Sequence, residues 1–147
     1  MKKLATFAFA LVAAVASPAL AGETPSPEGA KLYFVNLKDG DKVSSPVKVI
    51  FGLSGMGVAP AGIEQTDTGH HHIFLNRPEL GKGEDGAEEF NLNIPADDNH
   101  RHFGGGQTEA SLELPAGQHT LQLVLGDQDH IPHNPPVVSP RITITVE

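Results

Sequence analysis

The 147-residue sequence contains no cysteine. Without cysteine no disulfide can crosslink the fold, and a lipid-anchored lipoprotein is excluded as well. Basic residues are also few, because 10 Lys and Arg stand against 18 Asp and Glu, which gives a formal charge of −8 at pH 7. Such a chain repels phosphate backbones, so we do not expect nucleic acid as a partner. Stability must therefore come from an apolar core or from a bound ion.

Long apolar runs are absent except near the start of the chain. The run from Leu4 to about Ala16 follows two lysines and is closed by Pro18. This order predicts a Sec-type signal peptide over residues 1–21, cut between Ala21 and Gly22, and a periplasmic or secreted product. Because a spanning helix needs about 20 apolar residues, we expect no membrane span in the mature chain.

The predicted mature chain is more acidic than the whole sequence. The signal peptide removes two of the 10 basic residues and none of the 18 acidic ones, so the formal charge changes from −8 to −10. We expect residues 22–29 to form a short linker rich in Pro and Ser, and residues 30–147 to form one domain.

The mature chain lacks helical periodicity and shows a period of two instead. Alternation of apolar and polar residues predicts seven short strands separated by Gly, Pro and Asp turns. Their approximate ranges are 32–37, 47–53, 70–76, 90–94, 107–114, 121–125 and 142–146, of which 90–94 has the weakest pattern. This spacing is typical of an all-β fold, an immunoglobulin-like antiparallel β-sandwich.

The eight histidines all lie in the predicted domain, and seven of them fall in three groups. In a sandwich whose strands cross its full height, successive connections alternate between the two ends. The loops after the second, fourth and sixth strands then share one end, where the three groups would meet. This reasoning requires the fourth strand, and it places His119 at the opposite end.

These histidines suggest a metal site. Neutral imidazole is the commonest metal ligand and suits zinc and copper. In a His-x-His sequence on a strand, both side chains leave the same face, about 6.6 Å apart. We therefore expect a copper or zinc ion to be held by residues from the set His70, His72, His100, His102, His130 and His133.

Acidic side chains lie at the same predicted end, and they have several possible roles in an ion site. They either ligate the ion directly or orient the imidazoles through hydrogen bonds. They also suit a calcium site, because calcium prefers carboxylate oxygens. The residues concerned are Asp97, Asp98, Asp127 and Asp129.

The orientation of the third strand stays open at this stage. His71 shares a face with Ile73 and Leu75, so it suits core packing as well as ligation. If Phe74 is the inward residue instead, His70 and His72 point into the core.

Other candidate ligands have alternative roles too. Met56, in a Gly-rich segment, is either a thioether ligand that favours copper or a packing residue. The loop that holds His130 and His133 contains Pro132, so it equally suits a rigid recognition surface. No catalytic residues are assigned, since Ser54 lacks the second glycine of a nucleophile elbow.

The stretch His100-Arg101-His102-Phe103-Gly104 resembles part of the copper-zinc superoxide dismutases, which also use an immunoglobulin-like sandwich. The resemblance covers five residues only. The disulfide of that family is impossible in a chain without cysteine, so a dismutase-like enzyme is the least favoured function.

A wider resemblance covers nearly all of the predicted mature chain. It is carried by five segments: YFVNLKDG at 33–40, FGLSGMGV at 51–58, GHHH at 69–72, HFGGGQTE at 102–109 and LVLGD at 123–127. They resemble the secreted bacterial family catalogued as domain of unknown function 4399. The resemblance implies an exported single-domain protein and brings no established activity.

The sequence supports two main functional hypotheses. The first is a periplasmic protein that binds copper or zinc through histidines at one end of a β-sandwich, for metal buffering, delivery or sensing. The second is a metal-free interaction module whose His- and Pro-rich loops bind another envelope protein. In both cases a binding protein is more strongly indicated than an enzyme.

Overall fold

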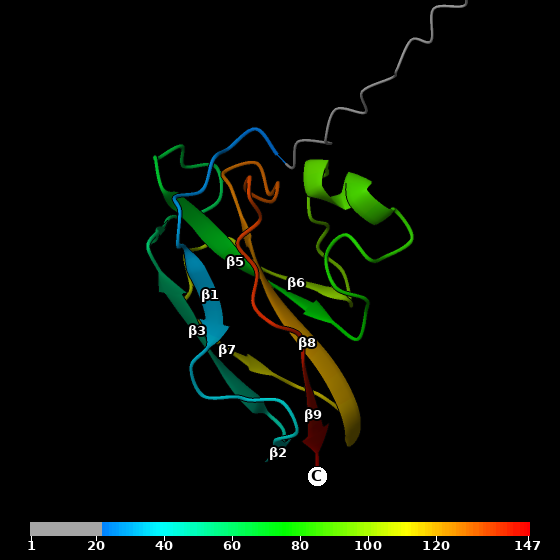
Figure 1. Ribbon diagram of the computed structural model, residues 1–147. Coiled ribbons are helices and arrows are strands. Elements are labelled where there is room, and N and C mark those ends of the chain that lie inside the picture. The colour runs from blue at the N-terminus through cyan, green and yellow to red at the C-terminus, as the bar shows by residue number, and fades with distance from the viewer. Residues whose placement is uncertain (1–21) are drawn as a thin grey trace, which may run out of the picture.

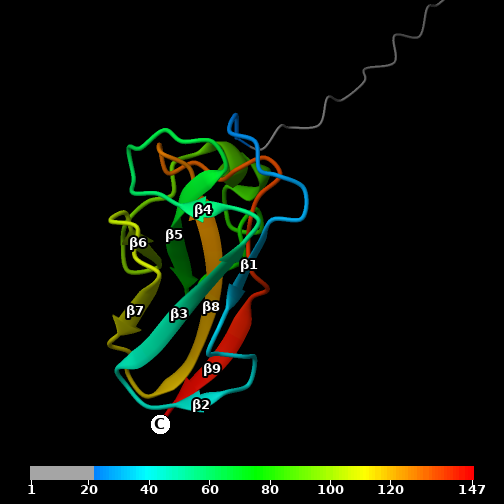
Figure 2. The same ribbon diagram turned by 90° about the vertical axis from the view of Figure 1, so that its left-hand side faces the viewer.

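The computed structural model describes residues 22–147, and the predicted signal peptide, residues 1–21, lies outside the described residues. Two β-sheets form the two layers of the protein (Figure 1), and Figure 2 shows strand β3 of the first layer passing in front of β8 of the second. The all-β sandwich predicted from the sequence is confirmed.

The smaller sheet has three antiparallel strands in the order β1-β3-β7. Their bounds are Lys31–Phe34 for β1, Val47–Ser54 for β3 and Glu109–Leu112 for β7. In an immunoglobulin-like sandwich these are the positions of the first, second and fifth strands.

The larger sheet has six strands, in the order β2-β9-β8-β5-β4 with β6 paired to β5. The strands are β2 (Lys42–Val43), β4 (Gly57–Val58), β5 (Thr68–Leu75), β6 (His100–Phe103), β8 (Gly117–Gly126) and β9 (Ile142–Val146). The long strands β5, β8 and β9 pair in antiparallel fashion, as the third, sixth and seventh strands of such a sandwich do.

The main core lies between the two sheets. Because side chains on a strand point alternately to its two faces, each strand contributes every second residue to this core. The alternating residues that meet there include Val47, Val49 and Phe51 of β3 and Leu121, Leu123 and Leu125 of β8.

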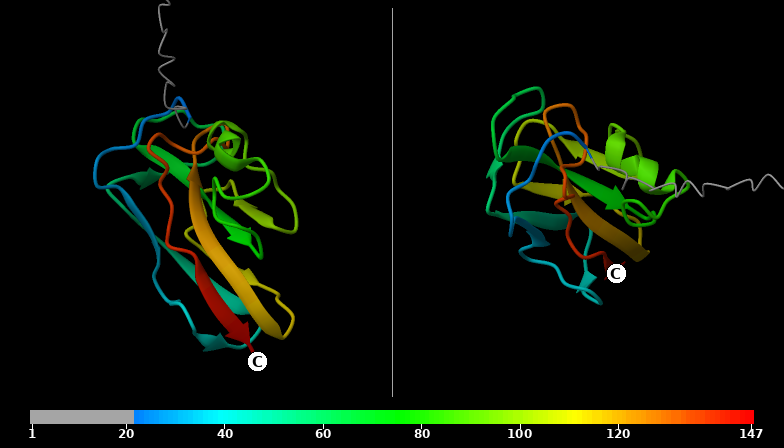
Figure 3. Two further views of the ribbon diagram at one scale, coloured as in Figure 1. Left: turned by 45° about the vertical axis from the view of Figure 1, so that its right-hand side comes forward. Right: turned by 45° about the horizontal axis from the view of Figure 1, so that its top comes forward.

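Strand β5 is buried along both faces. Ile73 and Leu75 face the main core, whereas Phe74 packs on the outer side with Leu80 and Val124. The segment between β5 and β6, which includes the 3-10 helix η1 (Gly86–Asn91), lies on the side of this sheet away from β1 and β3 (Figure 3). Of the two orientations left open by the sequence, His71 therefore points into the main core.

The predicted fourth strand, Phe90–Ile94, is wrong, because its first residues belong to η1. Alternation at Phe90, Leu92 and Ile94 does not correspond to one buried face, since Leu92 is 48% exposed. Two intervening asparagines bond to backbone groups far away in the chain, and these contacts take the place of strand pairing: Asn91 accepts from the Gly22 amide and Asn93 donates to the Asp129 carbonyl.

A strand forms instead at His100–Phe103, a segment that the sequence placed in a loop. Its partner is β5, with which it pairs in antiparallel fashion. The histidine groups were expected to meet at one end because a fourth strand was predicted at 90–94, and this strand does not form. The rings that meet do so because β6 pairs with β5.

The segment predicted as a linker lies along the domain. Pro25 forms a bridge with Asn134, and the Ser26 amide donates to the Asn134 carbonyl at 3.1 Å. Within residues 22–147, no helix has the length and apolar character needed to cross a membrane.

The central position of β8 predicts a large cost for truncating its core residues. Leu123 is fully buried, so Leu123→Ala should lower the free energy of unfolding by about 2–5 kcal/mol, through lost apolar burial and the cavity left behind. Urea unfolding measures this change. The control Val35→Ala, at a position that is 55% exposed, should change it by less than about 0.5 kcal/mol. Equal effects of the two substitutions would contradict the assigned core.

Candidate metal centre

Strand β5 carries three consecutive histidines that are all fully buried. Alternation along the strand sends His71 into the main core, where its ring lies 4.8 Å from that of Phe51. His70 and His72 leave the opposite face together, with ring centroids 4.7 Å apart. The outer face of β5 thus presents two imidazoles side by side.

Strand β6 adds a third ring through its register with β5. His102 pairs directly with His72, and residues directly opposite in an antiparallel pair have side chains on the same face. The two rings stack with centroids 5.1 Å apart. His102 is exposed, so it forms the solvent side of the group.

The fourth ring comes from the loop between β8 and β9. His130 has a positive φ of 66°, a conformation that non-glycine residues rarely adopt without support. The Asp127 carboxylate supports it by accepting from the amides of Asp129 and Ile131, each at 2.9 Å. In addition, the Ile94 amide donates to the His130 carbonyl at 2.8 Å.

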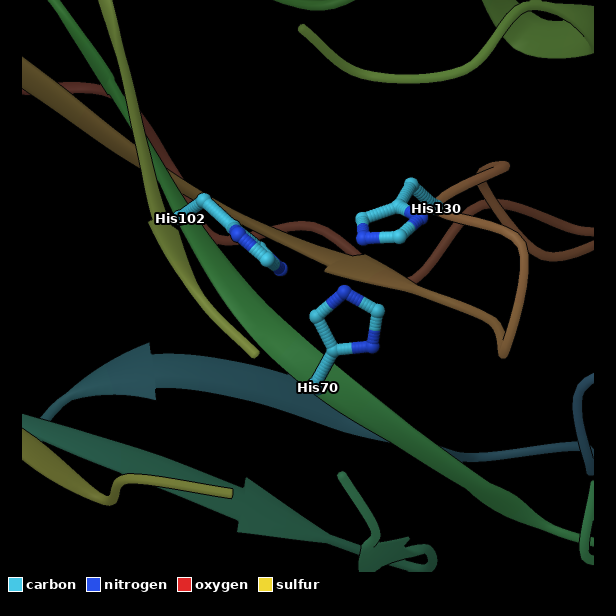
Figure 4. Close-up of side chains that lie close together, drawn as sticks. All are labelled: His70, His102 and His130. Carbon is cyan, nitrogen blue, oxygen red and sulfur yellow. The ribbon is translucent and has the colours of Figure 1, made fainter. Parts of the chain in front are cut away.

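These four rings, His70, His72, His102 and His130, are called the histidine cluster below. All six pairs of ring centroids lie between 4.7 and 5.9 Å apart. Figure 4 shows the rings of His70, His102 and His130 pointing toward one another from β5, β6 and the loop. Each of these three offers a nitrogen, and the three nitrogens lie within 4.8 Å of one another.

The geometry suits a small cation with nitrogen ligands. Ligand nitrogens around a tetrahedral zinc ion lie about 3.3 Å apart, so small ring rotations would bring the three nitrogens to bonding distance. The Nε2 atoms of His70 and His72 are already 3.0 Å apart. The Nδ1 atoms of the same two rings are buried and have no hydrogen-bond partner.

Three rings of the cluster are held in their neutral form. Burial, followed by the neighbouring imidazoles, lowers the pKa of His70 from 6.5 to about 4 and that of His72 to about 2. Burial and His130 also lower the pKa of His102. At neutral pH these rings therefore keep the lone pair that a metal ion requires.

Two glycines leave room for the rings. A Cβ on Gly126 would lie 2.8 Å from Nε2 of His72, and a Cβ on Gly104 would lie 2.4 Å from Nε2 of His102. Any larger residue would displace a ring of the cluster. Neither glycine was singled out from the sequence, although Gly126, at the end of a strand, is the kind of glycine that marks a close approach.

The structure does not bring His100 or His133 to the cluster. His100 donates from Nδ1 to Asp97 at 2.8 Å and accepts at Nε2 from Arg77 at 2.6 Å. His133 is buried and donates from Nε2 to the Thr68 carbonyl at 3.1 Å. Both rings are thus engaged in contacts within the fold.

The other candidate ligands lie elsewhere. Met56 packs against the main core, and His119 bonds to Asn76 and to the Pro115 carbonyl. The carboxylate of Asp127 is occupied by the loop amides. Among residues 22–147, the only set of three or more His, Asp or Glu side chains close enough to share an ion belongs to the histidine cluster, so these residues contain no carboxylate set for calcium.

Fold and site together define an all-β sandwich with imidazoles converging from two strands and a loop. The chain belongs to the family described as Domain of unknown function (DUF4399), whose sequence model matches residues 49–147. This range contains all eight histidines, and the match confirms the resemblance found in the sequence. No curated protein and no solved structure matches the chain.

The lowered pKa values predict that the metal-free protein loses stability in mild acid. Unfolded histidines bind protons near pH 6.5, whereas His70 and His71 do so only near pH 4 in the fold. Between these values the unfolded state holds more protons, so the free energy of unfolding falls as the pH drops, by on the order of 1–2 kcal/mol per buried histidine between pH 7 and pH 5.

Urea unfolding in the presence of a chelator measures this loss. His71→Leu removes one buried ring outside the cluster and should show a smaller fall between pH 7 and pH 5 than the unmodified protein. Val35→Ala, at an exposed position away from the histidines, should keep the full fall. If His71→Leu retains the same pH dependence, the buried ring is not neutral and the prediction fails.

The space beside Gly104 predicts a local effect of an added methyl group. Gly104→Ala should displace the His102 ring while the sandwich stays folded, because its Cβ would overlap that ring. The ring signals of His102 in NMR spectra report the displacement. In Gly105→Ala, whose Cβ meets only the flexible Gln107 side chain at 3.2 Å, the same signals should stay in place.

Proposed function

We propose that the histidine cluster binds a zinc or copper ion, and that the protein serves in buffering, delivering or sensing this ion outside the bacterial cytoplasm. The observation that carries the proposal is the approach of three imidazole nitrogens, from three separate elements, to within 4.8 Å of one another. An ion would give these converging nitrogens a shared polar partner.

The donor set favours divalent ions. The cluster contains nitrogen only, since Met56 packs against the core and the chain has no cysteine. Soft sulfur ligands select Cu(I), whereas imidazole suits Zn²⁺ and Cu²⁺. The excess of acidic residues in the sequence also favours the attraction of cations.

The burial pattern supports exchange of the ion. His70 is buried, His130 is half-buried and His102 is exposed, so the cluster reaches the surface on one side. An ion held there remains accessible to water, to a chelator or to a partner protein, as buffering and delivery require. The predicted signal peptide adds the location, a periplasmic or extracellular one.

Calorimetric titration of the chelator-treated mature protein with Zn²⁺ and Cu²⁺ tests the proposal. We expect one ion per chain, and about tenfold or more weaker binding for each of His70→Ala, His102→Ala and His130→Ala, because each removes a ligand. His100→Ala is the matched control, since it lies two residues from His102 on the same strand and outside the cluster.

Two outcomes would contradict the metal-binding function. One is that the unmodified protein binds neither ion more tightly than about 10 µM, a binding free energy of only about −7 kcal/mol. The other is that His100→Ala weakens binding as much as His102→Ala. The first result would favour the metal-free interaction module instead.

A further inference from the structure

The backbone nitrogen of Gly22 is held by two acceptors. Gly22 is buried, and its nitrogen lies 2.9 Å from the Phe90 carbonyl oxygen and 3.1 Å from Oδ1 of Asn91. The first acceptor is a main-chain carbonyl near the end of η1, where such carbonyls have no partner within the helix, and the second is a side-chain oxygen of the last helical residue. A nitrogen at this position thus meets more acceptors than a peptide amide can fully use.

An amino terminus fits this place better than an amide. A peptide N–H has one hydrogen to divide between the two acceptors, whereas an ammonium group has three. The α-amino group has a pKa of about 7.7–8.0 in general, so it is mostly charged at neutral pH. Its surroundings are acidic as well, because Glu23, Asp127 and Asp129 line the adjoining cavity of about 610 Å³.

Only glycine fits at this position. Gly22 has a φ of +44°, and a Cβ there would lie 2.1 Å from the carbonyl oxygen of Pro132. The residue that follows the predicted cleavage site is therefore also the residue that the fold requires. These two requirements are independent, since the first comes from the signal-peptide pattern and the second from the packing.

The residues after Gly22 reach the loop that carries His130. The Thr24 hydroxyl donates to Oδ2 of Asp127 at 2.6 Å, while the other oxygen of that carboxylate accepts from the loop amides. The Asn134 amide donates to the Thr24 carbonyl at 2.9 Å. The segment Gly22–Thr24 thus holds the loop on both sides of His130.

We infer that signal-peptide cleavage frees an amino terminus that anchors the loop of the histidine cluster. Hydrolysis of the Ala21–Gly22 bond by a signal peptidase adds one water and leaves a carboxylate on Ala21 and an ammonium on Gly22. This ammonium docks on the end of η1, and the docked segment holds His130 in place through Thr24 and Asp127. Thr24 and Asp127 are then positioning residues, and the link to metal binding rests on the proposed function of the cluster.

The experiment compares two secreted forms of the mature protein. One begins with a free amino group on Gly22, and the other keeps Ala21, so that Gly22 has an amide. Mass spectrometry of the exported protein should show Gly22 as its first residue. In metal-free protein, keeping Ala21 should lower the urea midpoint and shift the NMR ring signals of His130, and it should weaken zinc binding about tenfold or more.

Single substitutions separate positioning from general destabilisation. Thr24→Val should shift the His130 ring signals in the same way, because it removes the hydroxyl that bonds to Asp127. Thr24→Ser, which keeps a hydroxyl, should restore them. Glu28→Gln, at an exposed position of the same segment that does not line the cavity beside Gly22, should leave both the urea midpoint and the ring signals unchanged.

Each result decides a separate part of the inference. Another amino-terminal residue, or an unchanged urea midpoint when Ala21 is kept, would overturn the docking of the ammonium. A lower midpoint with unchanged His130 signals would overturn the positioning of His130. If the Gly22 form binds no zinc while its His130 signals still respond to Ala21, docking and positioning are supported and the proposed metal binding fails.

Discussion

The antiparallel pairing of β5 with β6 decides which imidazoles meet. Its register puts His102 opposite His72, and the alternation along β5 puts His70 beside them on the same face. A shift of one residue in this register would turn His102 to the other face and bring Phe103 or Arg101 to its place. The cluster therefore depends on backbone hydrogen bonds between two strands with 24 residues between them in the chain.

Much of the fold could be predicted from the sequence, because strands with one buried face leave a period-two pattern. Six of the seven predicted strands exist, and they form the two sheets in an immunoglobulin-like arrangement. The segment around Phe90 has the same alternation and is not a strand, since its asparagines bond to the amino-terminal segment and the β8–β9 loop. Alternation does not distinguish these long-range contacts from a sheet partner.

The candidate site was predictable as a group of histidines and not ring by ring. Spacing placed His70 and His72 on one face, and this holds for any straight strand. Spacing alone does not show that His102 joins the cluster while His100 does not. His100 is excluded because Arg77 and Asp97 bond to its two ring nitrogens, and these contacts are not visible in the sequence. Nor does it separate His130 from His133, whose ring reaches a backbone carbonyl 65 residues away.

Packing four imidazoles together has a cost that the rest of the domain must offset. His70 and His72 are taken out of water, and their Nδ1 atoms gain no hydrogen bond in return. The apolar layers on both sides of β5 supply the compensation, the main core on one side and the Phe74 group on the other. The sandwich thus keeps the metal-free rings in place.

The low pKa values of His70 and His72 have a consequence for competition between protons and cations. An ordinary histidine site with a pKa near 6.5 releases its cation in mild acid, because protons occupy the same lone pairs. Here the folded rings stay unprotonated until about pH 4 and about pH 2. Protons therefore do not compete for the lone pairs of these two rings in mild acid, and mild acid acts on them through the stability of the fold instead.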